Sequence, residues 1–513
     1  MIKPRKVLTA AQMGAVDRAT IESGIPGIVL MENAAHRCVE FLAAKYGPLS
    51  EQRIVVVCGK GNNGGDGLAI ARQIYIRFHP RELRVVLIAE PAELKGDAAL
   101  NYRMLMAAGL QIYQDFGTEM RTSSLVIDAV LGTGLSGPAT GEALNAIREI
   151  NTAFPLAKVF AVDIPSGLSG DSGVPPGDFV RADATVTFTA PKVCHAVPPA
   201  SHLMGELVVA PIGSPSMLYE ADDSIQLSQI MPASIARLFA PRERDSNKGR
   251  YGHVLVVAGA RGKSGAAVMC GLSALRAGAG LVTVACPEDT LDAVAAAAPE
   301  LMTEPLPPRG ALNRIAELME KRTLLAIGPG IGTTDETRQT VRRLFDGLRK
   351  PMVVDADALN CIAGSHWEAG DDLRVLTPHP GEMSRLSGHS IEEVQAYRIE
   401  AVRDMATDRR SIIVLKGDGT LLGFPDGHVW VNPTGSPAMA TGGTGDVLTG
   451  LVAGLLAQFP HDAERAIAGG VYLHGLAGEI AARHLMEQPV IATDLLKFLP
   501  EGIREIRNLP HGV

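Results

Sequence analysis

Short apolar runs alternate with longer amphipathic stretches along the first part of the chain. We expect helices over 10–24 and 27–47, followed by β-like runs at 53–59, 83–90, 124–130, 158–165 and 184–190. Strands that alternate with helices predict a parallel sheet covered by helices on both faces.

The same pattern starts again later in the chain. β-like runs are expected at 253–260, 281–287, 323–330, 351–357, 373–379 and 411–417. An Asp-Gly pair between apolar runs predicts a β-hairpin over 420–432. Between the two blocks, at 211–225, periodicity is lost and Gly, Ser, Pro and Asp accumulate. We therefore predict two α/β domains, 1–225 and 226–513.

Composition narrows the class of protein. Apolar residues make up 46% of the 513 residues, charged residues make up 20%, and the net charge is −8. This charge argues against nucleic acid or an anionic membrane as a partner. We see neither a signal-peptide core nor an apolar run of about 20 residues, the length that spans a bilayer. The six cysteines form no CxxC pair, which favours reduced core thiols in a cytoplasmic protein.

A glycine-rich segment, GKGNNGGDG at 59–67, follows the first apolar run of the first block. It is neither a GxxxxGK[ST] phosphate loop nor a clean GxGxxG. A plain strand-to-helix turn with Asp66 as a cap is one interpretation. Asp128, Asp163 and Ser166 also lie at strand ends, which share one edge in a parallel sheet. Oxygen ligands gathered there suit a cation, or one acid can serve as a general base.

The segments GIVLMENAA, GKGNNGGDG, VIDAVLGTG and VDIPSG resemble the NAD(P)H-hydrate epimerase family. That resemblance implies a Rossmann-like three-layer αβα domain that interconverts the R and S hydrates at C6 of the nicotinamide ring. It also implies potassium, with Asn63, Asp128 and Ser166 as ligands. The implied substrate contacts are Asn62, Asn63, Gly64, Gly65, Asp66, Gly132, Thr133, Gly134, Leu135, Ser136, Gly137, Pro138 and Asp163.

Three further positions of this block bear on the expected site. We favour Asp163 as the acid–base group. Lys192 is expected either to contact a substrate phosphate or to be an exposed surface lysine. Ala35 stands where the family pattern has glycine, a small change.

In the second block, the segment ATGGTGDVLTG leads into a long apolar stretch. The first N–H groups of such a helix have no intrahelical partners, and they stabilise negative charge on a phosphoryl group. Asp446 is then placed to accept a proton from an attacking hydroxyl. The plainer alternative is a turn with Asp446 as an acid in the first helical turn.

This GTGD segment resembles the ribokinase-like superfamily. A closer similarity, to the ADP/ATP-dependent NAD(P)H-hydrate dehydratases, rests on AIGPGIG, VVDADALN, TPHPGE, LKGDGT and GGTGD. His379 replaces the Asn of the ribokinases while Glu382 keeps the acid, and Asn247 stands where the dehydratases have His. The resemblance implies that Ala267, Gly330, His379 and Asp446 contact the hydrated dinucleotide. It implies that Lys416, Gly417, Asp418, Gly419, Thr420 and Gly445 contact the adenine nucleotide.

Together the resemblances imply a bifunctional repair enzyme for hydrated NADH and NADPH (NADHX and NADPHX). Phosphorylation turns the ring hydroxyl into a good leaving group, and this chemistry calls for magnesium and for ADP or ATP; we favour ADP, released as AMP. The alternatives are a ribokinase-like small-molecule kinase with a non-catalytic first domain, and a nucleotide sensor without catalysis. A homo-oligomer is plausible for such an enzyme.

Overall fold

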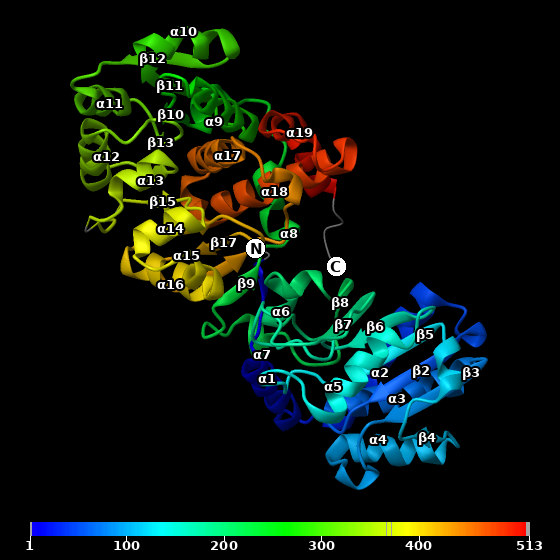
Figure 1. The fold of residues 1–513 in the computed structure, drawn as a ribbon. Helices are drawn as coiled ribbons and strands as arrows, with labels where there is room; N and C mark the ends of the chain where they lie inside the picture. Colours follow the sequence, from blue (N-terminus) through cyan, green and yellow to red (C-terminus); the bar gives the residue numbers. More distant parts are fainter. Residues whose placement is uncertain (1–2, 366, 371, 509–513) are drawn as a thin grey trace. The chain divides into compact units, whose positions relative to one another are not determined.

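The computed structural model describes residues 3–365, 367–370 and 372–508. The chain separates into two compact units (Figure 1). The first spans Arg5–Ile225, and the second runs from Gln226 onward and takes in the chain before Arg5.

The first unit is built on a parallel sheet with the strand order β4-β3-β2-β5-β6-β7-β8. All five predicted strands are present, while β4 and β8 were not predicted. The strands are β2 (Arg53–Cys58), β3 (Glu82–Leu87), β4 (Ile112–Tyr113), β5 (Leu125–Ala129), β6 (Lys158–Val162), β7 (Ala184–Phe188) and β8 (Glu206–Ala210), after the short β1 (Arg5–Lys6).

Helices cover both faces of this sheet, because the side chains of a strand alternate between its faces. Ile54, Val56 and Cys58 of β2 pack in a core with α2 and α3, whereas Val55 and Val57 pack in a second core with α5. The helices are α1 (Ala10–Glu22), α2 (Gly27–Tyr46), α3 (Asn62–Phe78), α4 (Gly96–Ala107), α5 (Gly141–Thr152), α6 (Val193–Ala196) and α7 (Met217–Glu220). The predicted α/β fold class is confirmed.

The glycine-rich segment at 59–67 is more helical than its composition predicts, because α3 already begins at Asn62. Its glycines allow close packing. A Cβ atom on Gly64 would lie 1.8 Å from the carbonyl oxygen of Gly59, and one on Gly67 would lie 2.5 Å from Ala129. The first turns of α3 therefore lie directly against the ends of β2 and β5.

The second unit is also built on a sheet, with the order β9-β18-β17-β16-β15-β14-β13-β10-β11-β12 within this unit. Only the β16-β17 and β17-β18 pairs are antiparallel, and the latter is the predicted hairpin. The strands are β9 (Leu227–Gln229), β10 (His253–Val257), β11 (Leu281–Pro287), β12 (Met302–Leu306), β13 (Leu324–Ile327), β14 (Met352–Val354), β15 (Arg374–Leu376), β16 (Ile412–Leu415), β17 (Leu421–Gly423) and β18 (Val429–Val431).

A tight helix pair packs over this sheet. A Cβ atom on Gly450 of α17 would lie 2.0 Å from the carbonyl oxygen of Cys270 in α9, so glycine is needed where these helices meet. The helices are α8 (Pro232–Ile235), α9 (Ser264–Ala277), α10 (Glu288–Ala297), α11 (Ala311–Met319), α12 (Asp335–Gly347), α13 (Asp357–Ile362), α14 (Pro380–Ser387), α15 (Ile391–Ala396), α16 (Arg398–Asp408), α17 (Thr444–Gln458), α18 (Ala463–Leu485) and α19 (Ala492–Asn508).

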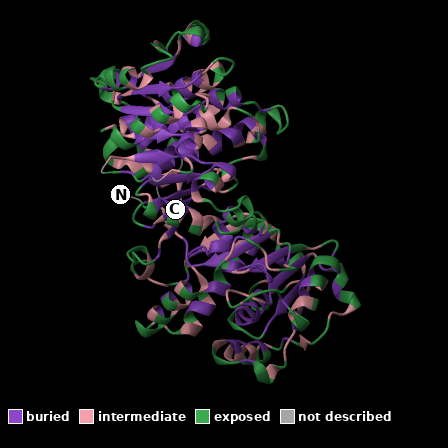
Figure 2. Ribbon diagram, turned by 60° about the vertical axis from the view of Figure 1, so that its left-hand side comes forward, coloured by how far each residue is buried: buried purple, intermediate pink, exposed green. Residues whose placement is uncertain are grey.

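The strands of both units are buried along most of their length (Figure 2). All six cysteines are buried and outside disulfides, as predicted. Among the residues that the structure describes, no helix has the length and apolar character to cross a membrane.

Candidate active sites

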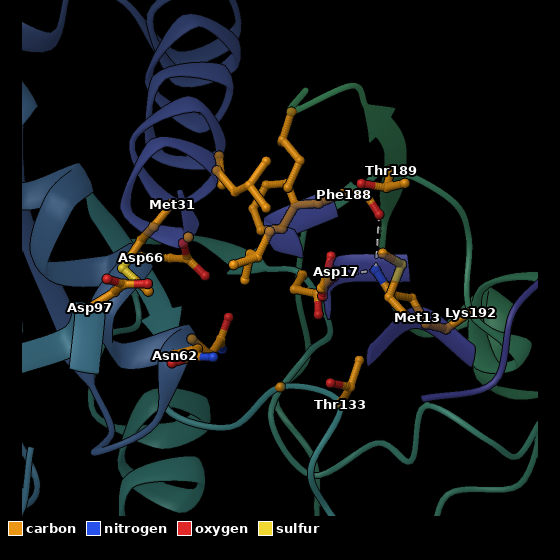
Figure 3. A pocket seen from close by; sticks show the side chains of 18 residues that line it. Met13, Asp17, Met31, Asn62, Asp66, Asp97, Thr133, Phe188, Thr189 and Lys192 are labelled. Atoms are coloured by element: carbon orange, nitrogen blue, oxygen red, sulfur yellow. Dashed lines mark hydrogen bonds and ion pairs between the residues drawn. The ribbon is translucent and has the colours of Figure 1, made fainter. Parts of the chain in front are cut away.

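A pocket of about 200 Å³ opens at the carboxyl ends of the strands of the first unit. It contains six of the residues expected at the epimerase site: Asn62, Asn63, Asp66, Gly132, Thr133 and Asp163. Figure 3 shows Asn62 and Asp66 on one side of the pocket, and Asp17, Thr133 and Lys192 on the other. Neighbouring strands β2, β5 and β6 end here, which explains why segments distant in sequence meet.

Asp163 is held in place by a buried network. Its Oδ1 accepts hydrogen bonds from Lys192 Nζ at 2.7 Å and Thr187 Oγ1 at 2.8 Å. Its backbone has φ of +64°, a conformation that costs energy for a residue other than glycine and is concentrated at functional sites. Burial raises the pKa of Asp163, but the charge and hydrogen bond of Lys192 outweigh it and hold the pKa below its usual value. Asp163 is therefore a carboxylate at neutral pH.

Lys192 contradicts both expectations for it. The residue is 1% exposed, so it is not a surface lysine. Its ammonium group donates to Asp163, to Thr187 Oγ1 at 2.9 Å and to the carbonyl oxygen of Phe188 at 3.1 Å. An ammonium group has three N–H bonds, and all of them point to protein oxygens. Lys192 thus fixes Asp163 and has no donor left for a phosphate.

His195 completes this network. Its Nδ1 accepts the N–H of Lys192 at 2.9 Å, so the proton of the neutral ring is on Nε2, which lies 3.0 Å from the carbonyl oxygen of Asp163. Burial and the positive charge of Lys192 lower the pKa of His195 to about 3. The ring is neutral and ties the backbone of Asp163 to the start of α6.

The three expected potassium ligands lie together beside the pocket. Ser166 donates to Asp128 through its N–H at 2.8 Å and its Oγ at 2.6 Å. Leu131 links Ser166 to Asn63, because its N–H donates to Ser166 Oγ and its carbonyl oxygen accepts from Asn63 Nδ2 at 2.9 Å. Within the described chain, the buried Oδ1 of Asn63 has no hydrogen-bond partner. An orphaned oxygen beside a buried carboxylate fits a cation site.

Three further carboxyl groups face the pocket, Asp66 from α3, Asp17 from α1 and Asp97 from α4. Burial raises the pKa of Asp66 well above its usual value, and the charges of Asp163 and Asp17 add to the effect. Burial also raises the pKa of Asp17. Sequence reasoning missed Asp17, because no motif links a helix near the N-terminus to the strand ends.

The loop after β5 borders a second, larger hollow of about 1070 Å³, into which Gly134 and Leu135 also face. Three expected contacts further along the loop, Ser136, Gly137 and Pro138, are exposed and line neither hollow. Gly64 and Gly65 are buried in α3, where only their backbone can face a ligand.

In the second unit, the GGTGD segment begins α17 as predicted. Gly443 is the N-cap, with φ of +95°, and Asp446 lies in the first turn. Burial raises the pKa of Asp446 to about 6, and the charge of Asp355 contributes. A carboxyl group beside unpaired helix N–H donors can accept a proton near an anionic phosphoryl group.

Lys416 joins this helix to two acids. Its Nζ lies 2.8 Å from Asp355 Oδ1 and 3.6 Å from Glu382 Oε2. A Cβ atom on Gly445 would lie 3.5 Å from the same ammonium group, so Lys416 adds positive charge beside the start of α17. Burial lowers the pKa of Lys416, but Asp355 and Glu382 outweigh it and keep the pKa above its usual value.

Asp355 was missed as a site residue in sequence reasoning. It is 1% exposed, and its Oδ2 accepts a hydrogen bond from Thr449 Oγ1 of α17 at 2.7 Å. Its place after β14, within VVDADALN, is the signal that could have found it, since polar groups at strand ends of parallel sheets face ligands.

His379 and Glu382 cap the start of α14. His379 Nδ1 accepts the N–H groups of Gly381 and Glu382 at 3.0 and 3.3 Å, and Glu382 Oε2 accepts the N–H of His379 at 2.8 Å. His379 is therefore a hydrogen-bonded turn residue, although 49% of its side chain is exposed. The exposed part of the ring remains open to a ligand.

The remaining expected contacts are spread over neighbouring loops. Gly330 lies in a loop tied to the one before α9, since its carbonyl oxygen accepts the N–H of Ala260 at 2.7 Å. Ala267 is fully buried. Gly417, Asp418, Gly419 and Thr420 form a partly exposed turn, and Arg398 lies 3.4 Å from the carbonyl oxygen of Gly419.

A divalent metal has no dedicated cage within the described ranges, where no group of three or more His, Cys, Asp or Glu side chains is arranged to hold one. Magnesium in phosphoryl-transfer sites keeps several waters and uses one or two carboxylates plus the nucleotide phosphates. The carboxylates Asp355 and Glu382 beside Lys416 fit that donor chemistry.

Comparison with known proteins places these two sites in one family. Residues 254–501 match the model of NAD(P)H-hydrate dehydratase, and residues 27–194 match that of the YjeF-related protein N-terminus. The bifunctional NAD(P)H-hydrate repair enzyme Nnr of Moorella thermoacetica is 41% identical over 98% of this chain and 97% of its own length.

Solved structures cover the second unit. An ADP/ATP-dependent NAD(P)H-hydrate dehydratase from Bacillus subtilis, co-crystallized with ATP/Mg2+, is 33% identical with a TM-score of 0.50, over 54% of this chain and 97% of that one. A ribokinase-like superfamily protein from Enterococcus faecalis is 28% identical with a TM-score of 0.50, over 55% and 96%. The chain therefore belongs to the family of bifunctional NAD(P)H-hydrate repair enzymes.

Proposed function

We propose that this chain repairs hydrated NADH and NADPH in two steps, epimerisation in the first unit and nucleotide-dependent dehydration in the second. Family membership over 98% of the chain supports both activities. The same coverage disfavours the alternative of a small-molecule kinase with an idle first domain, because both halves align with bifunctional relatives.

The dehydration site is centred on Asp446. Asp446 takes the proton of the ring hydroxyl, whose oxygen attacks the terminal phosphorus of the nucleotide while the bond from that phosphorus to the bridging oxygen breaks and the shortened nucleotide leaves. The N–H groups at the start of α17 and the ammonium group of Lys416 stabilise the charge on that phosphoryl group. The ring nitrogen then expels the phosphate, and loss of a proton restores the dihydropyridine. With ADP, the nucleotide we favour, AMP and phosphate are released.

The observation that carries this assignment is the position of Lys416, 2.8 Å from Asp355 and next to Gly445. A partly buried cation at the N-terminus of a helix, beside an acid with a raised pKa, fits phosphoryl transfer better than mere structural support. Turn residues Gly417, Asp418, Gly419 and Thr420 are assigned to the adenine nucleotide, and Gly330, His379 and the backbone at Ala267 to the dinucleotide. Asp355 and Glu382 would hold magnesium, which would neutralise phosphate charge.

Epimerisation is assigned to the pocket around Asp163, which acts as the acid–base group. Asn62, Asn63, Asp66, Gly132 and Thr133 are its substrate contacts, together with the backbone at Gly64 and Gly65 and the loop from Gly134 to Pro138. Asn63, Asp128 and Ser166 would hold potassium, whose positive charge would favour the anionic dinucleotide near the four pocket acids. The orphaned Oδ1 of Asn63 supports this ligand set.

Purified protein with both NADHX epimers, magnesium, potassium and ADP or ATP tests the proposal. The absorbance of the reduced nicotinamide should recover fully. If the absorbance recovers only by the share of the S epimer, and the R epimer is converted no faster than by spontaneous epimerisation, the role of the first unit is contradicted. No recovery with either nucleotide would contradict the proposal as a whole and favour the kinase or sensor alternatives.

A further inference from the structure

The pocket of the first unit holds more acid than a single acid–base group requires. Asp17, Asp66, Asp97 and Asp163 all line it, and Lys192 is the one lysine or arginine among its lining residues. Lys192 is committed to Asp163 at 2.7 Å. The other acids therefore lack a cationic partner in the pocket, and their proton content needs a separate explanation.

Asp66 is the most enclosed of these remaining acids. It is 9% exposed, on the first turns of α3, and it points into the pocket from the side opposite Lys192 (Figure 3). No residue that the structure describes donates a hydrogen bond to its carboxyl group, in contrast to Asp163, which receives two at Oδ1. Burial without hydrogen-bond donors disfavours the charged form of a carboxyl group and favours the protonated form.

The groups around Asp66 also favour its protonated form. The groups that face it are Asp17 from α1, the Cys38 thiol from α2, Asp97 from α4, and Asp163 with Lys192 across the pocket. Burial and the two acids Asp163 and Asp17 raise the pKa of Asp66 well above its usual value, and Lys192 counteracts this only in part. At neutral pH the environment therefore favours the protonated form of Asp66 and the carboxylate form of Asp163. A pair of acids with pKa values shifted in opposite directions is typical of a general acid and a general base in one site.

We infer that Asp66 is the general acid of the epimerisation and works across the pocket from Asp163, which is the general base. This inference rests on the epimerase activity proposed above. The hydroxyl group at C6 is bonded to the carbon next to the ring nitrogen. The lone pair of that nitrogen forms a C=N bond as the C6–O bond breaks, and the departing oxygen takes its electron pair and the proton of Asp66 and leaves as water.

A water molecule then attacks C6 from the opposite face of the ring and gives its proton to Asp163. The nitrogen regains its lone pair, so that the ring, the hydroxyl group and the charge are restored with inverted configuration. One proton has moved from Asp66 to Asp163, and exchange with solvent returns it after product release. The reverse epimerisation follows the same steps backwards, with the two acids exchanging roles.

The variant Asp66→Asn tests the inference, because it keeps the shape of the side chain but has no proton to transfer. We expect epimerisation to fall about 10²- to 10⁴-fold, while dehydration of the S epimer, which is assigned to the second unit, stays unchanged. Unmodified enzyme should lose epimerase activity as pH rises and Asp66 ionises, and this alkaline limb should vanish in the variant. Asp178→Asn, which alters an exposed pair with Arg148, is the matched control and should leave the rate unchanged.

Oxygen exchange supplies a second measurement that a structural role of Asp66 would not affect. In H₂¹⁸O, each epimerisation by unmodified enzyme should place one ¹⁸O at C6. Retention of ¹⁶O would overturn the inference and indicate opening of the ring instead, as would an unchanged rate and alkaline limb in Asp66→Asn. If unmodified enzyme does not epimerise at all, the proposed function itself fails, so the two failures are distinguishable.

Discussion

The ammonium group of Lys416 lies 2.8 Å from the carboxylate of Asp355, and the two come from the ends of different strands, β16 and β14. Thr449 of α17 donates to the second oxygen of Asp355 at 2.7 Å. Asp355 therefore links the positive charge of the nucleotide site to the helix that bears Asp446. This link makes a buried aspartate outside the expected set of contacts important for the site.

Replacing Asp355 with asparagine should weaken both the fold and the site. The change leaves Lys416 without its nearest counterion, and breaking a buried pair costs about 3 kcal/mol. We expect a lower midpoint in urea unfolding followed by the fluorescence of Trp367 and Trp430, both in the second unit. Asp346→Asn is the surface comparison, and an equal shift in that variant would contradict a specific role for the pair.

Asp446→Asn should slow dehydration strongly and leave epimerisation intact. Loss of a general base lowers the rate about 10²- to 10⁴-fold. The assay is recovery of reduced-nicotinamide absorbance from the S epimer, with chromatographic separation of the epimers as the measure of the first activity. Turnover that persists in this variant would refute the assigned role.

Dehydration by the unmodified enzyme should depend on pH through the same residue. The pKa of Asp446 is raised to about 6, so the carboxylate that accepts the proton predominates above pH 6 and is lost below it. The rate constant kcat should fall tenfold per pH unit on the acid side. In Asp355→Asn this limb should move to lower pH, because Asp355 is one of the charges that raise the pKa. If the pH dependence of kcat in Asp355→Asn is the same as in the unmodified enzyme, Asp355 does not influence the pKa of Asp446.

Asn63→Ala should raise the potassium concentration needed for epimerisation. The substitution removes the buried oxygen that lacks a hydrogen-bond partner within the described chain. Titration of the epimerisation rate with potassium chloride, at ionic strength held constant with choline chloride, measures the effect. An unmodified enzyme that is equally fast in choline chloride alone would count against a potassium site.

His195→Gln should make the first unit less sensitive to acid. The pKa of His195 is lowered to about 3 in the folded protein, against about 6.5 for an unfolded chain. As pH falls below 6.5, only the unfolded state takes up the proton, so stability is lost between pH 6.5 and 3 and the loss at pH 5 is about 2 kcal/mol.

Hydrogen exchange of the β7 amides at pH 7 and pH 5 gives the corresponding free energies of opening. The glutamine variant should be less stable at pH 7, because it disturbs the hydrogen bonds to Asp163 and Lys192. Its free energy of opening should nevertheless fall less between pH 7 and pH 5 than that of the unmodified protein. The same acid-induced loss in both proteins would show that His195 is not responsible.

The sequence by itself determined the elements and the edge of each sheet that carries function. Apolar runs separated by amphipathic stretches predict a parallel sheet, and glycine-rich turns at 59–67 and 442–446 mark where its strand ends meet helix starts. This information is local in the chain, because periodicity and turn chemistry depend on near neighbours. Family motifs added the chemistry, since they preserve the residue types at those turns.

Only the tertiary structure decided which charges face each other. Lys192 reads as a surface or phosphate-binding lysine, yet it is buried against Asp163, 29 positions away. Asp17 joins its site from a helix near the N-terminus whose local sequence gives no sign of it, and the contacts of Asp355 with Lys416 and Thr449 link segments that are far apart in the chain. Pairing, burial and the resulting pKa values depend on contacts between distant segments and on the loss of water around them. Neither effect leaves a pattern among neighbouring residues.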